Sequence, residues 1–116
     1  LLDTAREGSK INALAVFHVT FPQSADPTGP SNIKGAVLVL HGADDPVTNR
    51  KAIAALEDEL DAAKVPWQTV LFSGTVHSFT DVTAPEPGYA TKVQKYDPEI
   101  AKRSYDLMRE FFAAHL

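Results

Sequence analysis

The chain has 116 residues, no Cys and a formal net charge of -4 at pH 7. This length allows one small domain, and an apolar share of 44% with 22% charged residues is typical of a folded globular protein rather than a disordered one. The acidic balance, without a Lys/Arg cluster, argues against nucleic acid or an anionic membrane as partner. The absence of Cys excludes disulfides and a cysteine nucleophile within this chain.

No apolar run approaches the length of a membrane span, and no signal peptide is visible. The lack of Cys is compatible with a cytoplasmic location, which is the location we expect. The first residue is Leu rather than Met, and residues 1–8 have the character of the last turns of a helix with Gly8 as its C-cap. We therefore expect the chain to be the later part of a longer protein.

The predicted elements alternate between strand and helix. Residues 11–19 and 35–40 are apolar runs of the kind found in buried strands. A helix is predicted for 49–64, where apolar residues recur at three- and four-residue steps and Thr48 or Asn49 can serve as N-cap. A further strand follows at 67–73, and a last helix begins at Asp97, an N-cap followed by Pro at the first helical position. This alternation predicts a three-layer α/β fold with a mostly parallel sheet and flanking helices.

Two segments between these elements are predicted to be loops. Residues 22–32 contain three Pro and one Gly, and residues 74–95 form a connection of a length that is usually functional or mobile in a small domain. Three strands also leave an apolar edge on the sheet. We expect the missing strands to come from an N-terminal half of the protein or from a second copy of the chain.

Polar residues follow two of the predicted strands. Asp44 and Asp45 come directly after an apolar run that ends at Gly42, and His77 follows the strand at 67–73. Catalytic groups of α/β sheets lie beyond the carboxyl ends of the strands. One carboxylate is therefore expected to accept from Nδ1 of His77, leaving Nε2 free to take a proton from a nucleophile. We assign Asp45 as this acid and expect Asp44 to hydrogen-bond the local turn.

The same residues form part of a longer pattern. The segments VLVLHGADDPV (37–47), WQTVLFSGTVHSF (67–79) and YDPEIAKRSYDLMREFF (96–112) resemble, in register, the later half of the dienelactone hydrolase family. The resemblance implies an α/β-hydrolase fold, a Cys or Ser nucleophile on a strand-to-helix elbow, and hydrolysis of an ester or lactone. By position, Asp45 matches the triad acid of the family and His77 its triad base, and no metal or organic cofactor is implied.

Two features depart from the family pattern. No Ser of the chain lies in Gly-x-Ser-x-Gly, so the nucleophile and the oxyanion hole are expected in the half before residue 1. Dienelactone-type members have an Arg four residues after the His, where it binds a substrate carboxylate, whereas this chain has Asp81. We therefore expect a small neutral ester or another acyl compound as substrate, and no activity from this fragment alone.

Alternatives stay open at several positions. Phe79 could contact substrate in an acyl pocket or pack beneath its loop, and Ser78 is discounted as a nucleophile because sequence neighbours rarely reach each other in the required geometry. His18 and His41 are expected to bind backbone carbonyls rather than a metal ion. For the whole chain, the alternative to an enzyme is a non-catalytic, degenerate hydrolase half that acts as a binding or assembly module through strand addition.

Overall fold

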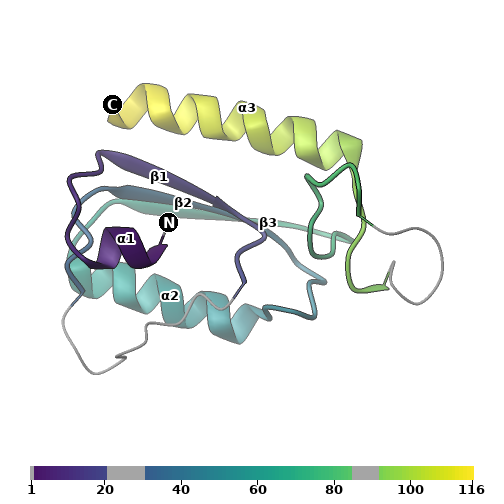
Figure 1. The fold of residues 1–116 in the computed structure, drawn as a ribbon, viewed down its shortest axis with the longest axis horizontal. Helices are drawn as coiled ribbons and strands as arrows, with labels where there is room; N and C mark the ends of the chain where they lie inside the picture. Colours follow the sequence, from purple (N-terminus) through teal and green to yellow (C-terminus); the bar gives the residue numbers. More distant parts are fainter. Residues whose placement is uncertain (1, 21–30, 85–91) are drawn as a thin grey trace.

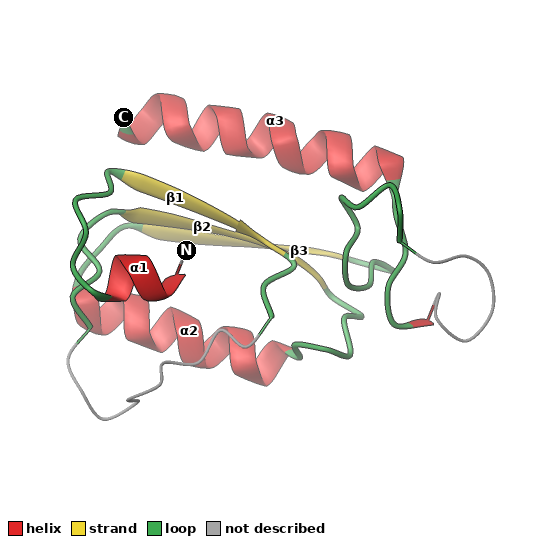
Figure 2. Cartoon of the chain, viewed as in Figure 1, coloured by secondary structure: helices red, strands yellow, loops and turns green. Residues whose placement is uncertain are grey.

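The computed structural model describes residues 2–20, 31–84 and 92–116. Its elements are, in order, α1 (Leu2–Arg6), β1 (Ala13–Phe17), β2 (Ala36–Gly42), α2 (Arg50–Ala63), β3 (Trp67–Phe72) and α3 (Pro98–His115). The strands form one parallel sheet in the order β1-β2-β3. Helices α1 and α2 cover one face of this sheet and α3 covers the other (Figure 1). Figure 2 shows the same three layers coloured by element type, which confirms the predicted α/β fold.

The predicted elements are all present, with some differences at their ends. β1 is shorter than the run predicted at 11–19. β2 continues through Gly42, so His41 is a strand residue rather than part of the turn after the strand. The loop predicted at 22–32 lies mostly, and the loop at 74–95 partly, outside the described residues.

The central strand β2 contributes to the apolar cores on both faces of the sheet because every one of its residues is buried. Successive side chains of a strand point to opposite faces. Val37 and Val39 therefore pack with α1 and α2, while Leu38 and Leu40 pack toward α3. The sheet is covered on both sides, as a parallel sheet requires.

Side-chain caps set the first turns of the two long helices. The Asn49 side chain accepts a hydrogen bond from the Ala52 backbone N–H at 3.0 Å, and Asp97 accepts one from Ile100 at 3.1 Å. Both caps satisfy amides that have no partner inside the helix. Helix α2 ends at Ala63, and its C-cap Lys64 adopts the left-handed conformation with φ 59°. The cap at Asp97 was predicted, as was a cap at Thr48 or Asn49.

Helix α3 is amphipathic and is the longest helix in the described part of the chain, with 18 residues. Ala101, Ser104 and Phe111 are buried on its inner side. The Ser104 hydroxyl donates to the Ala101 carbonyl at 2.7 Å, so its burial leaves no unpaired donor. Among the described residues, no helix is long and apolar enough to cross a membrane.

The end of β2 approaches the segment after β3 very closely. A Cβ atom on Gly42 would lie 2.3 Å from the carbonyl oxygen of Thr75, so only Gly fits at this point. The Ala43 N–H donates to the Phe72 carbonyl at 2.8 Å, and the Asp44 N–H donates to the Thr75 carbonyl at 3.0 Å. These contacts hold the residues after β2 beside the residues that lead to His77.

Candidate active site

Asp45 and His77 are hydrogen-bonded across neighbouring strand ends. Nδ1 of His77 lies 2.8 Å from Oδ2 of Asp45. The carboxylate side chain is completely buried, and the imidazole is 13% exposed. A carboxylate can only accept hydrogen bonds, so Nδ1 carries the proton and Nε2 is left as an acceptor. The contact expected from the sequence is therefore present in the structure.

The second oxygen of Asp45 binds the turn that follows β2. Oδ1 accepts hydrogen bonds from the backbone N–H groups of Val47 at 2.8 Å and Thr48 at 3.1 Å. This corrects the expectation that Asp44 would hydrogen-bond the turn, because the Asp44 side chain is exposed while Asp45 binds both amides. One carboxylate has enough lone pairs for both tasks. The turn thus orients the same carboxylate that binds His77.

His41 supports this turn from inside the sheet. Its Nε2 lies 2.7 Å from the Thr48 carbonyl and must donate there, because a carbonyl oxygen only accepts. The same nitrogen is 3.5 Å from Oδ2 of Asp45, and both side chains are buried. The predicted contact of His41 with a backbone carbonyl is confirmed. Within the described residues, Nδ1 of His41 has no hydrogen-bond partner.

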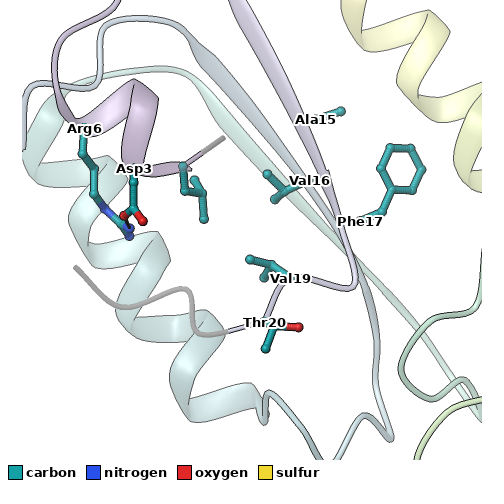
Figure 3. Close-up of a pocket in the computed structure, with 8 residues that line it drawn as sticks. Asp3, Arg6, Ala15, Val16, Phe17, Val19 and Thr20 are labelled. Carbon is teal, nitrogen blue, oxygen red and sulfur yellow. Dashed lines mark hydrogen bonds and ion pairs between the residues drawn. The ribbon is translucent and has the colours of Figure 1, made fainter. Parts of the chain in front are cut away.

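The other nitrogen of His77 is directed toward the segment after β1. Nε2 lies 3.2 Å from the Thr20 hydroxyl, which donates to it if Nδ1 carries the ring proton. Thr20 also lines a cavity of about 400 Å³ between α1 and β1, together with Val16 and Val19 (Figure 3). Thr20 was not predicted as a site residue, and its position just beyond a parallel strand is the only sequence signal that pointed to it.

His18 lies beside the pair. Its Nε2 is 2.8 Å from the hydroxyl of Thr80, a side-chain partner that was not predicted, and a backbone hydrogen bond at His18 itself raises the pKa of the ring. Burial, and secondarily the positive charge of His77, lower the pKa of His18 below its ordinary value. Across residues 2–20, 31–84 and 92–116, no three His, Asp or Glu side chains are arranged to hold a metal ion.

Ser78 and Phe79, which follow His77 in sequence, contact other side chains. Phe79 is completely buried, with its ring 5.7 Å from that of Phe72. The structure therefore places Phe79 beneath its loop, and a contact with substrate stays a prediction. The Ser78 hydroxyl lies 3.4 Å from the side chain of Gln94, which is consistent with its exclusion as a nucleophile.

Comparison with known proteins places these residues in a wider context. The sequence profile of the dienelactone hydrolase family matches residues 1–116. A solved dienelactone hydrolase-like promiscuous phosphotriesterase from metagenomic libraries, P91, is 35% identical with a TM-score of 0.83, and the match covers 98% of this chain and 46% of that one. A structure named m3DLH is 34% identical with a TM-score of 0.85, covering 99% and 47%. No curated protein matches. The chain thus spans about half the length of these solved structures.

Proposed function

This chain belongs to the dienelactone hydrolase family, and we propose that it supplies the acid and the base of a whole enzyme that cleaves ester or lactone bonds. The observation that carries the proposal is the 2.8 Å hydrogen bond between His77 Nδ1 and the buried carboxylate of Asp45. A general base needs its second nitrogen free to accept a proton. In His77, that nitrogen contacts the Thr20 hydroxyl, and no carboxylate of the described residues bonds to it.

The two side chains have separate tasks in the proposed reaction. Nε2 of His77 takes the proton from the hydroxyl or thiol of a nucleophile, which attacks the carbonyl carbon of the substrate. Asp45 stabilises the imidazolium that forms, and His77 then gives the proton to the leaving alkoxide. Water hydrolyses the acyl-enzyme with the help of the same base. The Cys or Ser nucleophile and the oxyanion donors belong to the N-terminal half of the whole protein in this proposal.

The charge near the site favours a neutral substrate. Asp81, four residues after His77, is exposed, and hydrogen bonds from the side chain and the backbone N–H of Thr83 lower its pKa. Asp81 is therefore negatively charged at neutral pH and repels an anionic substrate that approaches this loop. We propose a small neutral ester or lactone as the substrate.

The open edge of the sheet supports the proposed extent of the domain. Within residues 2–20, 31–84 and 92–116, β1 pairs with β2 on one side only, and its sequence ALAVF is entirely apolar. An unpaired apolar strand edge calls for another strand beside it. We propose that residues 1–116 form the nucleophile-lacking part of an α/β-hydrolase domain, and that the N-terminal half covers this edge in preference to a second copy of the chain.

Esterase assays of the whole protein test the catalytic assignment. With the coding sequence upstream of Leu1 included, Asp45→Asn and His77→Ala are each expected to lower kcat for p-nitrophenyl acetate by roughly 10⁴-fold, as losses of triad members do. Asp44→Asn is the matched control, because it changes the neighbouring exposed carboxylate. Full activity of Asp45→Asn would contradict the assignment.

The 116-residue chain alone provides a second test. Because it has no Cys and no Ser in an elbow motif, it should hydrolyse p-nitrophenyl acetate no faster than its His77→Ala variant. A clear rate difference between these two proteins would show that the fragment has a nucleophile of its own. An upstream sequence without a Cys or Ser elbow would instead favour the non-catalytic binding module.

A further inference from the structure

His18 has a backbone conformation that residues other than Gly seldom adopt. Its φ is 34°, in the left-handed region, although its N–H still donates to the Leu40 carbonyl at 2.9 Å and continues the pairing of β1 with β2. A non-Gly residue keeps a positive φ where the surrounding contacts hold it. The side-chain contacts of His18 are therefore expected to hold its backbone in this conformation.

All three of these contacts are made with the segment that carries the proposed base. Nε2 of His18 is 2.8 Å from the Thr80 hydroxyl. The His18 ring meets the ring of Phe79 edge to face, with centroids 5.3 Å apart and planes at 84°. It meets the ring of His77 in the same manner, at 5.3 Å and 72°. Such edge-to-face arrangements are favourable for ring pairs. His18 thus connects the end of β1 to residues 77–80.

Other contacts of His77 fix its backbone and its two ring nitrogens. The His77 N–H donates to the Val93 carbonyl at 3.0 Å, and the Lys95 N–H donates to the His77 carbonyl at 3.1 Å. Asp45 holds Nδ1 from the end of β2. The Thr20 hydroxyl lies 3.2 Å from Nε2, and hydrogen bonds at the two nitrogens still allow the imidazole to tilt about the line that joins them. The edge-to-face contact with His18, which follows β1, adds a third restraint, and this one acts on the plane of the ring.

The charge state of His18 suits this position. Burial, followed by the positive charge of His77, lowers the pKa of His18. A backbone hydrogen bond at His18 and the negative charge of Asp45 raise this pKa, and His41 lowers it. Asp81 also interacts electrostatically with His18. His18 is therefore neutral at neutral pH, and it places no positive charge beside the imidazolium that His77 becomes during ester cleavage.

We propose that His18 is a positioning residue that holds the His77 imidazole in the plane where Nδ1 meets Asp45 and Nε2 is directed to the reacting groups. The identity of the reacting groups rests on the proposed function. The restraint on the ring is a property of the 116-residue chain itself and is measurable without any catalytic activity.

The experiment is to measure the exchange with water of the His77 Nδ1–H proton by ¹⁵N-edited NMR. His18→Asn removes the ring and suits the backbone, because Asn tolerates a positive φ. We expect the proton to exchange roughly tenfold faster in this variant, a factor that corresponds to the free energy of one lost aromatic pair. Thr80→Val removes only the hydroxyl and should accelerate exchange by a smaller factor. His115→Asn, the same substitution at the end of α3, should leave exchange unchanged.

The variants separate this proposal from the proposed function. If His18→Asn does not fold, Thr80→Val decides the result. Unchanged exchange in the folded variants, together with loss of the Nδ1–H signal in Asp45→Asn, would overturn the positioning role and leave the catalytic pair intact. An Nδ1–H signal that persists in Asp45→Asn would overturn the pair and the proposed function with it. In the whole enzyme, His18→Asn should lower kcat with little change in KM.

Discussion

The body of β2 and two polar residues at its carboxyl end, His41 and Asp45, are all buried but are stabilised in different ways. Leu38 and Leu40 are at most 1% exposed and contact other apolar side chains. His41 and Asp45, at 0% and 4%, are held by hydrogen bonds. Apolar burial stabilises the fold in proportion to the area removed from water, whereas each buried polar atom needs a specific partner. The apolar strand body therefore stabilises the fold, whereas the hydrogen bonds at its end position the polar residues on which the proposed function depends.

The largest effect is expected in the strand body. Leu38→Ala removes a fully buried side chain from the α3 face and should lower the free energy of unfolding by about 2–5 kcal/mol. The matched control is Leu71→Ala on β3, where the side chain is 42% exposed and the loss should stay below about 1 kcal/mol. Urea unfolding followed by circular dichroism measures both. Equal losses in the two variants would contradict the assignment of Leu38 to the core.

A smaller loss of stability, but a larger disturbance of the site, is expected at the junction of the two regions. Gly42→Ala places a methyl group 2.3 Å from the backbone oxygen of Thr75, so the segment leading to His77 must shift, at a cost of about 1–3 kcal/mol. The NMR signal of the His77 Nδ1–H should be lost in this variant. Gly74→Ala is the control: Gly74 has φ 64° and open space around it, so the substitution introduces backbone strain only and should preserve that signal.

The smallest effect is the pH dependence that His18 contributes at the carboxyl end. Its pKa in the folded state lies below the ordinary value of 6.5, chiefly because of burial. As the pH falls below 6.5, the unfolded chain therefore binds more protons at this position than the folded chain does. The free energy of unfolding decreases until His18 is protonated in the folded state as well. Above pH 6.5 this penalty is absent. Unfolding titrations between pH 5 and 8 should show a steeper acid-side loss in the wild type than in His18→Asn, and parallel curves would contradict this explanation.

Much of the fold was accessible from the residue order because local patterns specify it. The alternating strands and helices, the caps at Asn49 and Asp97, and the parallel sheet all follow from periodicity and turn chemistry. The meeting of Asp45 with His77 was also predictable, because parallel strands bring their carboxyl ends to one edge of the sheet. These inferences need only short segments and one topological rule.

The remaining features depend on side-chain positions that no local pattern encodes. Whether Asp44 or Asp45 binds the turn follows from which carboxylate points inward once β2 extends to Gly42. The contact of His18 with Thr80 joins residues that are 62 positions apart. The residue order thus specified the elements and the edge of the sheet where the acid and the base lie. Their partners followed from three-dimensional packing, because a hydrogen bond depends on fractions of an ångström that only the assembled layers set.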